Sequence, residues 1–195
     1  MRIDMPVLRT GRISIEPFRA GDEDALLAGS ADPLVAQFAG LGWSGLTRAD
    51  LRRMIEERWP ALREEGRAAI SALRDAETGA VLGYLPLFDL NWVERRAEIG
   101  YWLMPSSRGR GVATEAVAAV VAWAFADLGL LRVQGVVDVA NVASQRVLER
   151  AGFEREGVLR SFKFLGDGTR GDAVLFSRVH TAEPRPPVRP LESDT

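Results

Sequence analysis

A short glycine-containing segment is the part of this chain whose residue types and spacing are best suited to chemistry. It lies between a predicted strand and a predicted helix and reads Arg108, Gly109, Arg110, Gly111, Val112 and Ala113, followed by Thr114. A helix N-terminus carries unpaired amide hydrogens and partial positive charge, and glycine lets the backbone approach an anion closely. The segment therefore predicts a phosphate-binding loop. A tight turn that merely needs glycine would have the same pattern.

Two better-known nucleotide loops do not fit this segment. A Walker loop needs a lysine directly after its last glycine, and the stretch from Gly111 to Thr114 contains none. A dinucleotide-binding fingerprint needs a third glycine where the chain has Thr114, and an acidic residue about 20 positions further on. Neither nucleotide fold is expected.

The composition argues against several other chemistries. The formal net charge of −2 and the sequence pI of 5.6 give no reason to expect a basic surface for nucleic acid. The chain has no cysteine and a single histidine, His180, so we expect no disulfide, metal site or cysteine nucleophile. No apolar run approaches the ~20 residues that cross a bilayer, and no apolar signal core follows the first charge. A cytoplasmic location, away from membranes, is the expectation.

Seven strands are predicted from alternating or continuous apolar runs. They span residues 12–18, 68–74, 80–88, 96–104, 131–138, 153–165 and 172–179. The second to fourth are expected to form an antiparallel meander. The run at 131–138 is nearly continuous, which is typical of a central strand buried on both faces. A glycine-rich turn at 166–168 is expected to join the last two strands.

Capping residues mark the helices of the first half of the chain. Asp22 is expected to cap a short helix, and Asp32, which precedes a proline, caps a second. Thr47, with an aspartate three residues on, resembles the capping box of a longer helix. We expect Pro60 to kink this helix or to end it early.

Two further helices are predicted in the second half, over residues 113–128 and 141–152. Residues 183–195 contain four prolines and little apolar surface, so they predict a disordered tail. Residues 1–182 are expected to form a single domain.

Three other elements accompany the glycine loop in a fixed order. They are the preceding strand Ala97-Glu98-Ile99-Gly100-Tyr101-Trp102-Leu103, the helix from Asn141-Val142-Ala143-Ser144 to Gly152-Phe153, and the Gly166-Asp167-Gly168 turn. With the loop, which matches Arg/Gln-x-x-Gly-x-Gly/Ala, they resemble the GNAT superfamily of acyl-CoA-dependent N-acyltransferases. The resemblance is closest to the Rim branch of ribosomal-protein N-terminal acetyltransferases. It extends over residues 8–179 and is strongest from residue 80 onward.

The resemblance implies a fold and a cofactor. The fold is α/β, with a mixed, mostly antiparallel seven-stranded sheet that is split between its fourth and fifth strands and has helices on both faces. The loop amides would hold the pyrophosphate of acetyl-CoA, and its pantetheine arm would lie in the split. An amide at Leu103 or Met104 would polarise the thioester oxygen. The implied cofactor-binding residues are Leu103, Met104, Arg108, Gly109, Arg110, Gly111, Val112, Ala113, Thr114, Asn141 and Ser144.

In enzymes of this family the acceptor amine attacks the thioester directly, so only an acid and a base are needed. A tyrosine that many members use as the acid has no evident counterpart here, and the matching motif offers Ser144 instead. Glu98 is the candidate base, because a carboxylate in a mostly apolar strand should have a raised pKa. The alternative is that Glu98 forms an ion pair with Arg96, or binds the substrate ammonium.

The resemblance thus predicts an N-acetyltransferase that acts on a primary amine, either a protein N-terminus or a small molecule. Two alternatives stay open. The same scaffold could use a longer donor such as succinyl-CoA, or it could bind CoA as a regulatory module without turnover. A homodimer through a sheet edge or the first helices is a further expectation.

Overall fold

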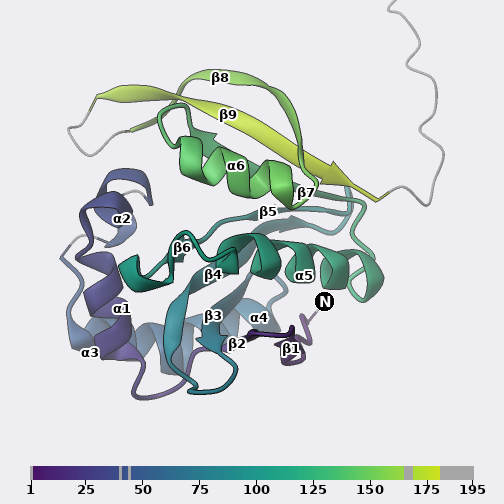
Figure 1. Cartoon of the computed structure of the whole chain (residues 1–195). Coiled ribbons are helices and arrows are strands. Elements are labelled where there is room, and N and C mark those ends of the chain that lie inside the picture. Colours follow the sequence, from purple (N-terminus) through teal and green to yellow (C-terminus); the bar gives the residue numbers. More distant parts are fainter. Residues whose placement is uncertain (1, 40, 44, 165–168, 181–195) are drawn as a thin grey trace, which may run out of the picture.

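The computed structural model describes residues 2–39, 41–43, 45–164 and 169–180. In it, one mixed sheet has the strand order β1-β2-β3-β4-β5-β7-β9-β8, with β6 beside β4 (Figure 1). The strands are β1 (Leu8–Arg9), β2 (Ile13–Pro17), β3 (Ala69–Asp75), β4 (Val81–Asn91), β5 (Arg96–Ile99), β6 (Trp102–Leu103), β7 (Arg132–Asp138), β8 (Glu154–Phe164) and β9 (Arg170–Val179). Every pairing is antiparallel except that of β5 with β7. The mostly antiparallel α/β fold is confirmed. The predicted turn at 166–168 and the tail at 183–195 lie outside the described residues.

The described sheet has nine strands rather than the predicted seven. One addition is β1, which is too short to show a periodic pattern. The other arises because the predicted strand at 96–104 is divided into β5 and β6. Both parts pair with β4, and the amide of Gly100 between them donates to the carbonyl of Pro86 at 3.0 Å. Only β5 also pairs with β7.

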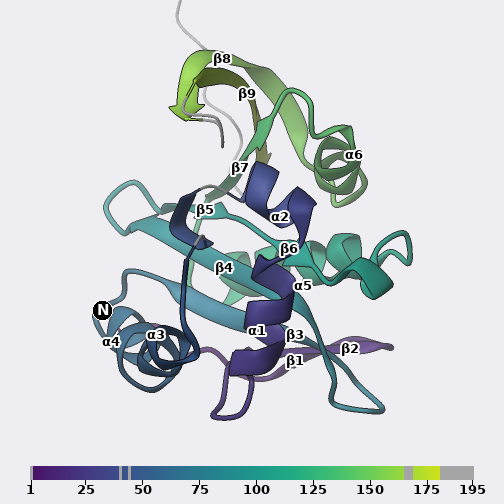
Figure 2. The same ribbon diagram turned by 90° about the vertical axis from the view of Figure 1, so that its left-hand side faces the viewer.

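Helices cover both faces of the sheet, as predicted. They are α1 (Glu23–Ser30), α2 (Pro33–Phe38), α3 (Arg48–Arg53), α4 (Trp59–Glu64), α5 (Val112–Ala126) and α6 (Val142–Arg150). One hydrophobic core packs α5 and α6 against one face, and a second core packs α1 to α4 against the other. Figure 2 shows α3 and α4 on one side of the strands and α5 on the other.

The sheet splits between β5 and β7, at the position predicted from the sequence. The two strands pair only from Arg96 with Arg132 to Glu98 with Gln134. Beyond that point β7 continues along β9 as far as Asp138, while the chain after β5 stays with β4. The two halves of the sheet therefore diverge beside the N-terminus of α6 (Figure 2).

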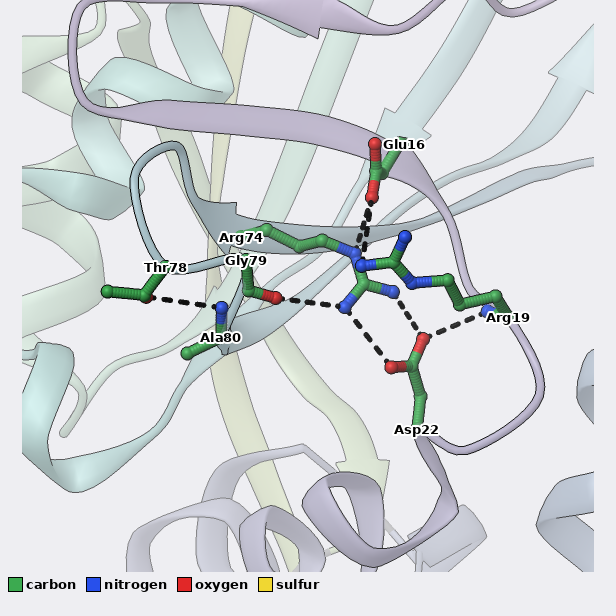
Figure 3. Close-up of polar contacts among 7 residues, drawn as sticks. All are labelled: Glu16, Arg19, Asp22, Arg74, Thr78, Gly79 and Ala80. Carbon is green, nitrogen blue, oxygen red and sulfur yellow. Dashed lines mark hydrogen bonds and ion pairs between the residues drawn. The ribbon is translucent and has the colours of Figure 1, made fainter.

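Asp22 is the N-cap residue of α1 (Glu23–Ser30), as predicted, but its side chain does not cap the helix. Its carboxylate accepts no amide of α1 and instead binds the guanidinium of Arg74 in β3 (Figure 3). Arg74 is only 2% exposed to solvent. The Nε atom of Arg74 lies 2.5 Å from Oε1 of Glu16 in β2. The Nη1 atom of Arg74 donates to the carbonyl of Gly79 at 3.3 Å. A buried guanidinium needs anionic partners, so Asp22 satisfies Arg74 and thereby holds the start of α1 against the sheet.

The other caps of the first half are confirmed. Asp32 accepts the amides of Leu34 and Val35, and Thr47 with Asp50 forms a capping box. Pro60, however, does not end the helix. A π-helical turn, Met54–Arg58, directly precedes α4, and such a turn is a recognised way to accommodate irregularity within a helix.

The prediction for β7 is confirmed in part. The strand is central in the sheet, and Val133 and Val137 are buried. On the opposite face Arg132, Gln134 and Val136 are only half-buried, and the second core, which packs α1 to α4 against that face, includes no residue of β7.

Candidate active site

The glycine segment forms the N-terminus of α5. Gly109 and Gly111 have φ angles of 71° and 80°, in the left-handed region that glycine occupies without steric cost. Within the described residues, no partner is seen for the amides of Gly109, Arg110 and Gly111. The first amides of α5, starting at Val112, have no intrahelical acceptor either. A Cβ built on Gly109 would meet no atom within 4 Å, so an anion can approach these amides closely.

A basic residue from outside the motif, Arg12, also lies next to this loop. The Nη2 atom of Arg12 is 3.4 Å from the position of a Cβ on Gly111. Arg12 also donates to Glu115 of α5 at 2.8 Å. The guanidinium of Arg12 therefore lies beside the loop as part of an ion pair with Glu115. The packing of the chain before β2 against α5 places it there.

The guanidinium of Arg108 is already bound within the protein. It donates to Asp32 at 2.6 and 3.3 Å and to the carbonyl of Leu103 at 3.0 and 3.2 Å. The hydrogen bond from Arg108 is the main reason that the pKa of Asp32 is lowered, and burial opposes it. Arg108 thus connects the loop to α2 and β6, and contact of its side chain with a cofactor stays a prediction.

The edge of the sheet at the split has unpaired backbone groups. The amide of Met104 donates to Leu82 at 2.8 Å, and that of Gly100 donates to Pro86. In an antiparallel pair, hydrogen-bonded and non-hydrogen-bonded residues alternate. Tyr101 and Leu103 therefore direct their amides away from β4, toward the split. This removes Met104 as the amide that polarises a thioester and leaves Leu103 as the candidate.

Asn141 and Ser144 lie at the start of α6, on the far side of the split. Asn141 is the N-cap, and its Oδ1 accepts the amide of Ser144 at 3.1 Å. The hydroxyl of Ser144 is 2.7 Å from the phenol oxygen of Tyr101. Burial raises the pKa of Tyr101 above its ordinary value, and the bond with Ser144 opposes that rise. Sequence reasoning assigned Tyr101 no role, because nothing in its motif indicated that it would reach α6.

Glu98 is the last residue of β5 that pairs with β7. Its neighbours Ala97 and Ile99 are buried in the core beneath α5, so Glu98 points to the opposite face. Burial is the largest cause that raises the pKa of Glu98, and a hydrogen bond from Gln134 at 3.2 Å opposes it. Arg96, the expected ion-pair partner, donates to Asp89 instead, at 3.2 Å. Glu98 is therefore a half-buried carboxylate without a direct ion pair among the described residues.

Aromatic side chains extend along the same face as Glu98, toward α1. Trp102 stacks on Tyr84 with ring centroids 5.8 Å apart, and Trp43 meets Tyr84 edge-on at 4.8 Å. All three belong to or pack against the second core. Trp43 therefore acts as a packing residue of this aromatic group.

The glycine loop presents unpaired amides that can bind a phosphate, and it lies beside a split sheet with polar groups on both sides of the split. This combination defines the acyl-CoA N-acyltransferase class. The family model "Acetyltransferase (GNAT) domain" matches residues 12–154. The chain is 31% identical over 178 residues to "Uncharacterized N-acetyltransferase YoaA" of Bacillus subtilis, which covers 91% of this chain and 99% of that protein. The chain belongs to the GNAT family and is an acetyl-CoA-dependent acyltransferase.

Solved structures support the same fold. RimL, described as a ribosomal L7/L12 alpha-N-protein acetyltransferase in complex with coenzyme A, aligns with a TM-score of 0.81 at 20% identity, over 91% of this chain and 100% of that one. A spermidine N-acetyltransferase from Vibrio cholerae, in complex with CoA and spermine, aligns with a TM-score of 0.73 at 19% identity, over 87% and 96%. No described helix is both long and apolar enough to cross a membrane.

Proposed function

We propose that this acyltransferase moves an acetyl group from acetyl-CoA to a primary amine that enters from the Glu98 face of the sheet. The observation that carries the proposal is the arrangement of polar groups around the split. Glu98 is on one face, Ser144 is on the side of α6, and the unpaired amide of Leu103 is at the edge between them. Direct attack needs a base where the amine enters and an acid where the thiolate leaves.

Each group has one task in this proposal. The loop amides from Gly109 to Ala113 bind the pyrophosphate. The amide of Leu103 donates to the thioester oxygen as negative charge develops there. Glu98 accepts the proton of the attacking ammonium, directly or through a water, and its raised pKa brings it closer to the operating pH. Ser144 donates its proton to the departing sulfur.

The proteins similar to this chain suggest two acceptor classes. RimL is described as acting on a ribosomal protein and the Vibrio cholerae enzyme as acting on spermidine. Both kinds of acceptor present a primary amine, so we assign the chain a primary amine and include both classes in the test. Glu98 has no direct ion-pair partner among the described residues, and such a carboxylate favours a cationic acceptor.

A thiol-release assay with acetyl-CoA over a panel of N-terminal peptides and polyamines tests the activity. We expect release with at least one primary amine and none with its N-acetylated form. Tight CoA binding without release for any acceptor would instead favour a regulatory CoA-binding module. Faster release with succinyl-CoA than with acetyl-CoA would contradict the proposed donor.

The role of Glu98 has a separate test. The Glu98→Gln substitution should lower kcat by about 10²–10⁴-fold, which is the usual contribution of general base catalysis. It should also remove the acidic limb of the pH profile of kcat/KM. Glu94→Gln, an exposed position in the turn before β5, is the matched control and should leave both unchanged. A Glu98→Gln profile that keeps the acidic limb would exclude Glu98 as the base.

A further inference from the structure

Tyr101 forms a side-chain hydrogen bond across the split between the two halves of the sheet, at the level of Ser144. It lies between β5 and β6, whereas Ser144 lies in the first turn of α6. The phenol oxygen is 2.7 Å from Ser144 Oγ and 3.0 Å from the carbonyl oxygen of Ser144. One phenol thus lies within hydrogen-bond distance of two atoms of the same residue.

Counting the hydrogens shows that this group has two arrangements. A phenol and a serine hydroxyl carry one donor hydrogen each, and both oxygens can also accept. If Tyr101 donates to the carbonyl, the hydroxyl of Ser144 must donate to Tyr101, and its proton is occupied. If Tyr101 donates to Oγ, the proton of Ser144 is free for another acceptor. Only the second arrangement lets Ser144 act as an acid.

We infer that Tyr101 is the positioning residue for the proton donor Ser144: it donates to Oγ and so directs the Ser144 proton into the split. This inference rests on the proposed role of Ser144. As the carbon–sulfur bond breaks, its electron pair stays on sulfur, and the Ser144 proton moves to that sulfur. The nitrogen of the collapsing intermediate loses its second proton as the amide forms, and this proton returns to Oγ through water. Tyr101 keeps its own proton and stabilises the charge that develops on Oγ meanwhile.

The surroundings of both residues suit this role. Asn141 fixes the backbone of Ser144 through its amide, so the side-chain torsion is the main freedom that remains. Tyr101 packs against the first core, which fixes the ring. Burial raises the pKa of the phenol, so Tyr101 stays protonated and remains a donor at neutral and mildly basic pH.

The test compares Tyr101→Phe, Ser144→Ala and the double variant, because Tyr101→Phe removes a single oxygen. We expect Tyr101→Phe to lower kcat about tenfold at saturating substrates, which corresponds to one lost hydrogen bond in the transition state. CoA affinity, measured by calorimetry, should change less than threefold. The double variant should be no slower than Ser144→Ala. Tyr84→Phe, the other tyrosine of the chain, is the control and should stay within twofold of the wild type.

Each outcome separates the two proposals. If Ser144→Ala leaves kcat unchanged, the proposed acid is wrong and this inference falls with it. If Ser144→Ala slows turnover but Tyr101→Phe does not, only the positioning role is overturned. Independent, multiplicative losses in the double variant, or a loss of CoA affinity with normal kcat, also overturn it. Urea unfolding of the unliganded variants gives a second readout: Tyr101 and Ser144 should be energetically coupled there too.

Discussion

The Asp32→Asn substitution would separate two roles of one carboxylate, which caps α2 and also joins α2 to the glycine loop through Arg108. Asp32 caps α2 by accepting the amides of Leu34 and Val35 at 3.1 and 3.2 Å, and it pairs with Arg108 at 2.6 Å. Asparagine caps helices as well as aspartate does, so the cap survives and only the charge is lost. Hydrogen bonds to charged groups contribute about 1.5–3 kcal/mol.

The side chain of Asp32 is 11% exposed and that of Arg108 is 31% exposed, so solvent screens the pair only partly. We therefore expect Asp32→Asn to lower the free energy of unfolding by about 1–2 kcal/mol. Asp32→Ala also removes the cap and should cost about 1 kcal/mol more. Because Arg108 directly precedes Gly109, the dissociation constant for CoA should rise about fivefold for each kcal/mol of loop order that is lost.

Urea unfolding and calorimetric titration with CoA measure both effects. Asp24→Asn is the matched control: its partner is Arg48 at 2.8 Å, but both side chains are more than half exposed. The control should stay within about 0.5 kcal/mol of the wild type. An Asp32→Asn variant as stable as the control, with unchanged CoA affinity, would refute the coupling of α2 to the loop.

The pH dependence of stability provides an internal check. The hydrogen bond from Arg108 is the largest cause that lowers the pKa of Asp32 below 3.8. The resulting stabilisation is complete above that value and is lost as the pH falls through the lower pKa of the folded state. The difference between wild type and Asp32→Asn should therefore shrink in acid. A difference that stays constant down to pH 2 would contradict this explanation.

Three further substitutions follow from the packing. Arg74→Met should cost about 3–5 kcal/mol, because it leaves buried carboxylates unpaired, whereas the exposed Arg19→Met should cost at most about 1 kcal/mol; thermal and urea unfolding compare them. Gly83→Ala places a Cβ 2.4 Å from a backbone oxygen of β6 and should lower the free energy of unfolding by about 1–3 kcal/mol. Gly157→Ala, whose added Cβ meets no atom within 4 Å, is the control and should leave the stability nearly unchanged. Glu98→Gln should be at least as stable as the wild type at pH 8. The pKa of Glu98 is raised in the folded state, so ionisation of this carboxyl lowers the stability of the folded protein as the pH rises above 4.5. Lower stability of Glu98→Gln than of the wild type at pH 8 would contradict the burial argument.

Short motifs in the sequence were sufficient for the backbone features on the predicted cofactor side of the site. The glycines at 109 and 111 and the cap at Asn141 depend on short motifs, and the position of the split was implied by the family resemblance that these motifs carry. The structure contains each of them. Side-chain partners far apart in the sequence were not predictable in this way. Asp32 and Arg108 are 76 residues apart, and Tyr101 and Ser144 are 43 residues apart. No periodic pattern connects such pairs; the packing of α2 and α6 on the sheet does.

The register of the sheet decides what the motif alone left open. The sequence offered either Leu103 or Met104 as the amide for the thioester, and only the pairing of Met104 with Leu82 distinguishes them. The same alternation places Glu98 and Tyr101, three residues apart, on opposite faces of one strand edge. A shift of one residue would exchange every one of these assignments. The pairing of β4 with β5 and β6 therefore determines, in a single step, which amide is free, which face carries the carboxylate and which face carries the phenol.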